Sequence, residues 1–200
     1  MIPVEPQPEP GDFDQKIRQP GRKWLKSLEV KPGDSLPKGT SFGSRDYWRK
    51  SQIDLWEKYG GICAYLCIYF ELSTGASSTD HFIPKSQDAW LAYEWSNFRL
   101  SCLSANRDKS TKSILDPFLL RKGMFLLDLL TGEIYPNPAL TSSEKTQVEN
   151  TIAVLKLNKS EYKSMRQRHY HDYMKYQLPG EYFESHSPFV YEEAKRQGLL

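Results

Sequence analysis

The most informative part of the chain reads STDHFIPKS at residues 78–86 and, after a short gap, SNFRLSCLSANRDK at residues 96–109. Residue preferences predict short strands over 79–84 and 97–103, and the polar segment 104–112 is typical of a helix that begins at a serine. Two short strands followed by a helix would return Asn106 to the neighbourhood of Asp80. The pattern therefore predicts a small site that contains a carboxylate, an imidazole and two carboxamides, from Asp80, His81, Asn97 and Asn106.

These residue types suit the hydrolysis of a phosphodiester. The reaction needs a base for water and positive charge beside the oxygens that become more negative in the transition state. A hard divalent cation supplies that charge and prefers oxygen ligands. Neighbouring strand residues face opposite ways, so Asp80 and His81 can serve one site only if the strand ends or twists there, as Pro84 suggests. The alternative is that His81 is an ordinary core histidine and that the asparagines are turn and cap residues.

The flanking sequence predicts further elements. Apolar residues at helical spacing predict a helix over 45–59, which Gly60 and Gly61 would end. Residues 62–72 are rich in β-favouring side chains and predict a strand, and the loop 73–79 follows it. Later segments predict a β-hairpin over 123–135, with its turn at Thr131 and Gly132. Two helices, which carry Val148 and Tyr162, and a last helix from Val190 are expected after it.

Residues 1–44 contain seven prolines, which predict an extended and irregular arm. The arm also carries a basic patch around Trp24, formed by Lys16, Arg18, Arg22, Lys23 and Lys26. Two interpretations are open: a solvated arm that packs its tryptophan on the body, or a direct contact with phosphate. We expect three regions, the arm 1–44, a core over 45–120, and a hairpin with helices over 121–200 that belongs to the same domain as the core.

Bulk properties set limits on the class of protein. With 200 residues, 38% of them hydrophobic and 26% charged, the chain can bury a globular core. A net charge of +2 is too small to indicate a nucleic-acid partner by itself. Charges interrupt every apolar stretch, so we expect a cytoplasmic protein without a membrane partner. The three cysteines, Cys63, Cys67 and Cys102, are an odd number, which argues against a disulfide framework.

The motif residues resemble the HNH, or ββα-metal, endonuclease family, whose pattern is Asp-His on the first strand, Asn at the second strand and Asn or His on the helix. The resemblance implies an α+β fold, a ββα-metal core with flanking helices and a β-hairpin. It implies that His81 is the general base, and that Asp80 and Asn106 hold one Mg²⁺ or Mn²⁺ ion. It also implies that Asn97 braces the loop between the strands.

The wider arrangement is similar to small bacterial HNH proteins of antiphage systems such as Septu, many of them encoded beside ATPases. The similarity covers residues 45–120 and rests on YW (47–48), YGGICAY (59–65), DHFIPKS (80–86) and YEWSNFRL (93–100). It implies a DNA-cutting effector with an ATPase partner. Many members hold the core with a structural zinc on two Cys-x-x-Cys pairs, but here Leu66 and Ala105 replace the second cysteine of each pair, so we expect apolar packing instead of zinc.

Five basic residues around the motif are candidates for contacts with DNA phosphates: Lys85, Arg99, Arg107, Lys109 and Lys112. Such contacts would give salt-dependent binding that is largely independent of base sequence. The alternative for each is an ordinary solvated charge. Two other functions stay open: a scaffold or nucleic-acid-binding subunit that keeps the ββα shape without turnover, and a nuclease that acts on RNA or transfer RNA.

Overall fold

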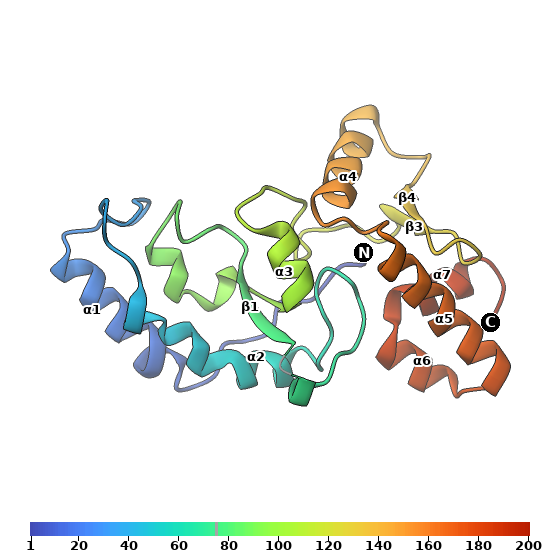
Figure 1. Ribbon diagram of the computed structural model, residues 1–200, viewed down its shortest axis with the longest axis horizontal. Helices are drawn as coiled ribbons and strands as arrows, with labels where there is room; N and C mark the ends of the chain where they lie inside the picture. Colours follow the sequence, from blue (N-terminus) through green and yellow to red (C-terminus); the bar gives the residue numbers. More distant parts are fainter. Residues whose placement is uncertain (75) are drawn as a thin grey trace. The chain divides into compact units, whose positions relative to one another are not determined.

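The computed structural model describes residues 1–74 and 76–200, and residue 75, within the predicted loop 73–79, lies outside the described residues. The fold is mixed α+β, and its described residues form seven α-helices and two antiparallel two-stranded sheets (Figure 1). The chain divides into two compact units. We call them the β1–β2 unit, residues 6–61 and 71–106, and the β3–β4 unit, residues 1–5, 62–70 and 107–200.

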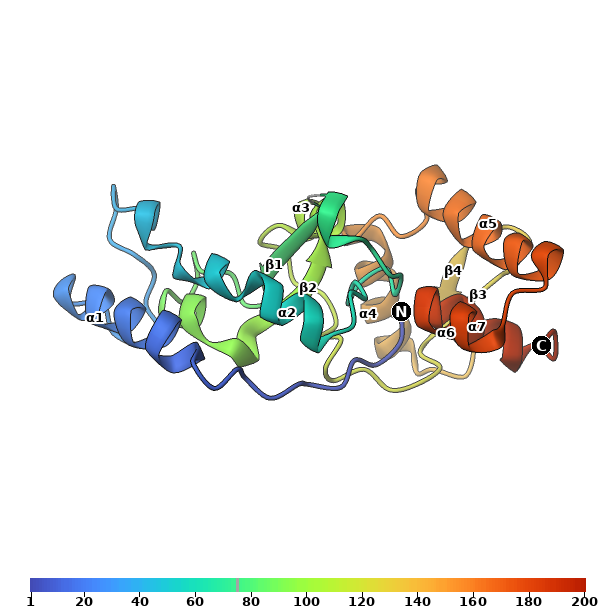
Figure 2. The ribbon, with the colours of Figure 1, turned by 90° about the horizontal axis from the view of Figure 1, so that it is seen from below.

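The β1–β2 unit is built on one antiparallel strand pair. Strand β1 (Ser77–His81) pairs with β2 (Phe98–Cys102), so that Asp80 lies opposite Arg99 and His81 opposite Phe98. Helix α3 (Leu103–Lys109) begins directly after β2, and α2 (Gln52–Lys58) packs against the pair (Figure 2). The predicted order of strand, strand and helix is confirmed, with boundaries shifted by one to three residues.

The segment 45–59, predicted as one helix, forms short 3₁₀ turns and a shorter α-helix. Short 3₁₀ turns at Gly43–Arg45 and Tyr47–Ser51 precede α2. Gly60 and Gly61 both adopt positive φ, 59° and 68°, which ends the helix as expected. Further 3₁₀ turns occupy Leu72–Thr74, Trp90–Tyr93 and Trp95–Asn97.

The strand predicted over 62–72 is wrong. Only an isolated bridge joins Ile62 to Tyr69, because the chain reverses between them. Cys67 adopts a left-handed φ of 53°, and its N–H donates to the carbonyl of Cys63 at 2.8 Å. All side chains from 63 to 67 are buried. The apolar residues that predicted a strand are therefore buried in the core as part of a tight turn.

The extended arm predicted over 1–44 is also wrong in its middle part. Residues Asp14–Arg18 form a π-helical turn that leads into α1 (Gln19–Ser27). Pro20 lies in the first turn of α1, where a missing N–H costs no helical hydrogen bond. Ile17, Gly21 and Leu25 recur every four residues and are buried, so the segment is amphipathic.

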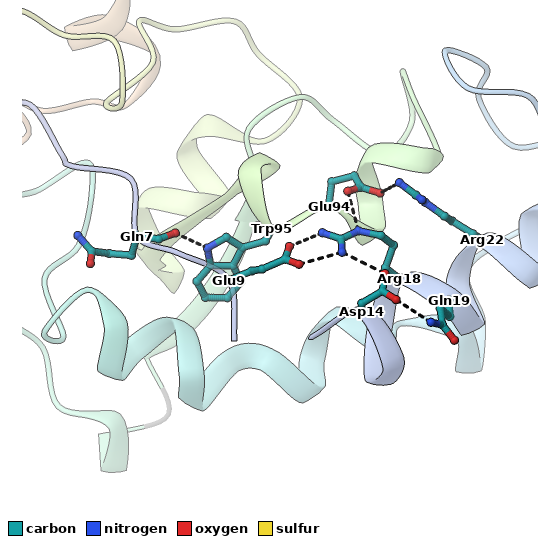
Figure 3. Close-up of polar contacts among 8 residues, drawn as sticks. All are labelled: Gln7, Glu9, Asp14, Arg18, Gln19, Arg22, Glu94 and Trp95. Carbon is teal, nitrogen blue, oxygen red and sulfur yellow. Dashed lines mark hydrogen bonds and ion pairs between the residues drawn. The ribbon is translucent and has the colours of Figure 1, made fainter. Parts of the chain in front are cut away.

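A cluster of ion pairs holds this helical segment to the rest of the β1–β2 unit (Figure 3). Arg18 pairs with Glu9, with Asp14 at 3.1 Å and with Glu94 at 2.9 Å, and Arg22 pairs with Glu94 at 2.7 Å. These carboxylates occupy the two arginines, which favours the packing interpretation of the basic patch over direct phosphate contact. Trp24 lies against Phe42, with 5.5 Å between ring centroids.

The β3–β4 unit contains the predicted hairpin and the C-terminal helices. Strands β3 (Phe125–Leu127) and β4 (Ile134–Pro136) pair across a turn in which Gly132 has a φ of 70°. The helices are α4 (Ser142–Val154), α5 (Ser160–Tyr176), α6 (Gly180–His186) and α7 (Pro188–Arg196). Thr141 and Glu144 form a capping box that starts α4. The last helix, α7, begins at Pro188, two residues before the predicted start at Val190.

None of the helices in residues 1–74 and 76–200 combines the length and the apolar character needed to cross a membrane.

Candidate functional site

The candidate site lies where β1 ends. Asp80 is 2% exposed and His81 is 7% exposed. Ser78 and Asp80 are two residues apart on β1, so they point to the same face of the strand. The side-chain nitrogen of Asn106, on α3, donates to Ser78 Oγ at 2.5 Å. The carboxylate of Asp80 and the carboxamide of Asn106 therefore belong to the same face of β1.

Two oxygen donors on this face suit a hard divalent cation. The Asn106 nitrogen is engaged with Ser78, which leaves Oδ1 as the acceptor atom of that side chain. Mg²⁺ commonly binds one or two protein oxygens and keeps several waters. Among the described residues, no cluster of three or more His, Cys, Asp or Glu side chains could enclose a metal ion. The donor set therefore fits a hydrated Mg²⁺ or Mn²⁺ ion better than a closed zinc site, which uses Cys and His ligands.

The imidazole of His81 is held in one orientation. Its Nε2 lies 3.2 Å from the carbonyl oxygen of Ala92, and because a carbonyl can only accept, Nε2 carries the proton. In the neutral ring Nδ1 is then the basic nitrogen. The rings of Trp48 and Phe98 meet the imidazole edge-on, at centroid distances of 4.9 and 5.3 Å. The ring thus has a defined tautomer and little freedom to turn.

Asn97 fixes the turn between the two strands. Its Oδ1 accepts from the N–H of Ile83 at 2.8 Å, while its Nδ2 donates to the carbonyls of Ile83 and Leu91, both at 3.0 Å. The N–H of Phe82 also donates to the carbonyl of Asn97 at 2.9 Å. The Asn97 side chain therefore joins the two ends of the segment 83–91 that follows His81.

Lys85 is a predicted basic residue that responds to the charge of this site. Burial lowers the pKa of Lys85, and the negative charge of Asp80 opposes that shift. The Lys85 ammonium also lies 5.4 Å from the ring centroid of Trp48, the same ring that contacts His81. Trp48 is a site residue that the sequence predicts only as part of a helix face, because nothing local indicates which ring the imidazole will meet.

The other predicted phosphate contacts differ in exposure. Arg99 is 3% exposed and donates to the carbonyls of Ser96 and Phe98, so its cation does not face solvent as that prediction requires. Lys109 is fully buried, which likewise differs from the surface charge expected. Arg107 and Lys112 are exposed, but both belong to the β3–β4 unit, whereas the site residues belong to the β1–β2 unit.

The three cysteines are all buried free thiols. Cys63 and Cys67 lie in the β3–β4 unit, where burial raises the pKa of the Cys67 thiol. Cys102 ends β2, and its sulfur lies 3.7 Å from Ser104 Oγ. Leu66 and Ala105, which occupy the positions of the missing cysteines, are both buried.

Comparison with known proteins adds no family assignment, because neither a family model nor a curated protein matches the chain.

Proposed function

We propose that this chain is a metal-dependent endonuclease of the HNH type that hydrolyses phosphodiester bonds in DNA. In this proposal Asp80 and Asn106 hold one Mg²⁺ or Mn²⁺ ion, His81 is the general base and Asn97 is a positioning residue. The proposal includes a role as nuclease effector in bacterial antiphage defence, together with an ATPase partner.

One observation carries the proposal: an antiparallel strand pair runs directly into a helix, and the helix returns a carboxamide to the face of β1 that bears Asp80. The Asn106–Ser78 hydrogen bond provides that return. If Asp80 and His81 were neighbours by chance, a metal-binding oxygen from α3 would not be expected on the same face of β1. The resemblance of the motif to ββα-metal nucleases supports the same assignment.

The residues divide the work of hydrolysis. His81 Nδ1 takes a proton from the attacking water, while the Nε2 bond to Ala92 keeps the ring oriented. Lys85, whose pKa responds to the charge of Asp80, supplies a cation that can offset charge on the phosphate. A bound divalent ion would supply further positive charge for the phosphate oxygens and the leaving 3′ oxygen.

The low exposure of Asp80 and His81 favours a second candidate, a scaffold or DNA-binding subunit that keeps the ββα shape without turnover. A phosphate must reach His81 for hydrolysis, so a nuclease requires an open route to this imidazole. A scaffold or DNA-binding subunit does not require such a route.

Incubating the purified chain with supercoiled plasmid separates these candidates. We expect nicked or linear product with Mg²⁺ or Mn²⁺ and none with EDTA. Parallel reactions with single-stranded RNA and with transfer RNA identify the preferred polymer, and a preference for either would replace DNA as the substrate. The same reactions with the ATPase partner present test whether the partner releases the activity. DNA binding without cleavage under all of these conditions would favour the scaffold.

A further inference from the structure

A cavity of about 520 Å³ lies beside the candidate site, within the β1–β2 unit. The loop 35–42 forms most of its wall, and Lys85 and Ser86 from the turn after β1 complete it. Lys85 is the same residue whose pKa responds to the charge of Asp80. The cavity and the candidate site therefore share a side chain.

Hydrogen bonds from the segment 83–91 hold the chain on the N-terminal side of this loop. The N–H of Ala89 donates to the carbonyl of Asp34 at 2.9 Å. The indole nitrogen of Trp90 donates to the carbonyl of Val30, also at 2.9 Å. Asn97 fixes the same segment from its other side. The position of the loop is thus coupled to the segment that connects the two strands of the site.

An aromatic contact anchors the other end of the loop. The ring of Phe42 meets Trp48 edge-on at 5.2 Å, and Trp48 in turn contacts His81 at 4.9 Å. Phe42 also packs on Trp24 of α1. The loop therefore connects to the imidazole through two successive ring contacts.

The chemistry of the wall suits an anion. Lys38 is exposed and Lys85 is partly buried, so the wall carries two cations. Hydroxyl groups of Ser35, Thr40, Ser41 and Ser86 supply hydrogen-bond donors, and no Asp or Glu lines the cavity. Lysines and hydroxyls are the groups that proteins use to contact phosphate oxygens.

We propose that this cavity binds the phosphodiester backbone of the substrate strand, at a phosphate next to the one that is cut. Lys38 and Lys85 flank that phosphate, and Lys85 connects it to the candidate site. The inference rests on the proposed function in taking DNA as the substrate, but it concerns binding and does not require turnover.

The test measures binding of a fluorescent DNA duplex in EDTA, by polarisation, over a range of salt concentrations. We expect Lys38→Glu to weaken binding several-fold and to reduce the slope of log affinity against log salt by about 1, as for the loss of one phosphate contact. Lys38→Arg should keep wild-type affinity. The matched control is Lys31→Glu, which makes the same charge change at an exposed residue of the same segment that does not line the cavity.

The outcomes separate this inference from the proposed function. If Lys38→Glu binds as tightly as Lys31→Glu, or if the wild-type chain does not bind the duplex, the cavity is not a phosphate site. If Lys38→Glu alone loses binding while the wild-type chain cuts nothing, the cavity assignment stands and the nuclease proposal fails. Thermal unfolding of each variant shows whether the exposed loop substitutions leave the fold intact.

Discussion

At the scale of single residues, the site depends on side chains that hold others in place. The Asn97 side chain bonds to backbone atoms of Ile83 and Leu91, in the segment that connects β1 to β2. His81 is bonded to Ala92, next to Leu91. The orientation of the imidazole is therefore set by a turn that one buried carboxamide keeps closed.

Replacing Asn97 by Ala should destabilise the fold by about 2–4 kcal/mol, because it removes three hydrogen bonds and leaves backbone groups without partners. Urea denaturation measures the change. The matched control is Asn150→Ala, where an exposed side chain makes one bond of 3.1 Å to Ser113 and where we expect a change within about 0.5 kcal/mol. Equal effects of the two substitutions would show that Asn97 does not close the turn.

Residue types and spacing predicted that Asn106 returns to the face of β1 that carries Asp80, because two strands and a helix bring fixed sequence positions together. Exposure could not be predicted in the same way. Arg99 follows the motif in sequence, yet its guanidinium caps backbone carbonyls and lies 4.9 Å from the ring of Phe82. Only the packing around a residue determines whether its charge reaches solvent.

At the scale of elements, α1 is fixed to the site region by Arg18. This side chain is 15% exposed, and outside its own segment it pairs with Glu9 and with Glu94, which is 18% exposed. Glu94 lies three residues before Asn97. The helix that precedes the core in sequence thus stabilises the turn that leads into β2.

The substitution Arg18→Ala should lower the free energy of unfolding by about 1–3 kcal/mol, since it leaves Glu94 partly buried with only the Arg22 contact. Chemical denaturation at neutral pH measures this loss. The control is Lys16→Ala, which breaks an exposed pair with Asp12 and should have no measurable effect. A loss no greater than that of the control would contradict the anchoring role.

The effect of Arg18→Ala should also depend on pH. The hydrogen bond from Arg18 lowers the pKa of Glu9 below its ordinary value of 4.5. A carboxyl with a lowered folded-state pKa stabilises the fold above its unfolded-state pKa, and this contribution is lost as pH falls through the folded-state pKa. The difference between wild type and variant should therefore shrink when the pH is lowered through 4.5 and below. A difference that stayed constant down to about pH 3, roughly one unit below the ordinary pKa range of glutamate, would exclude the Arg18–Glu9 ion pair as the cause.

A separate prediction concerns the packing of α1 against Tyr93. A Cβ atom at Gly21 would lie 2.3 Å from the Tyr93 ring, which is buried. Gly21→Ala should therefore destabilise the fold by about 1–3 kcal/mol, although alanine normally favours a helix. Thermal unfolding measures the effect, with Gly11→Ala as the control because no atom lies within 4 Å of a Cβ there. An increase in stability for Gly21→Ala would mean that α1 does not pack on this ring.

The elements differ in how far the sequence could predict them. The strands β1 and β2 and the helix α3 followed from local preferences because each is short and ends at a clear signal. The turn at 63–67 did not, because Cys67 takes a left-handed conformation that nothing in its residue type indicates. The helix α1 was not predicted either, because the prolines around it indicate an extended chain, whereas the four-residue spacing of Ile17, Gly21 and Leu25 forms a buried helix face.

At the scale of the whole molecule, the site residues belong to one unit made of two chain segments. Asp80, His81, Asn97 and Asn106 lie in 71–106, whereas Trp48 and Lys38 lie in 6–61. The segment 62–70 between these two belongs to the β3–β4 unit. The unit that carries the site is therefore discontinuous in sequence, and experiments on the site require the full chain.

The proposed nuclease activity depends most on His81 as the base that activates water for phosphodiester hydrolysis. The most direct test is the rate of Mg²⁺-dependent plasmid cleavage by His81→Ala, with and without added imidazole. The control is His171→Ala, which removes an exposed histidine of the other unit whose ring contacts Asp172. We predict that His81→Ala loses cleavage, regains part of it with imidazole and still binds DNA, while His171→Ala cuts like the wild type. Cleavage by His81→Ala at the wild-type rate would show that His81 is not the general base.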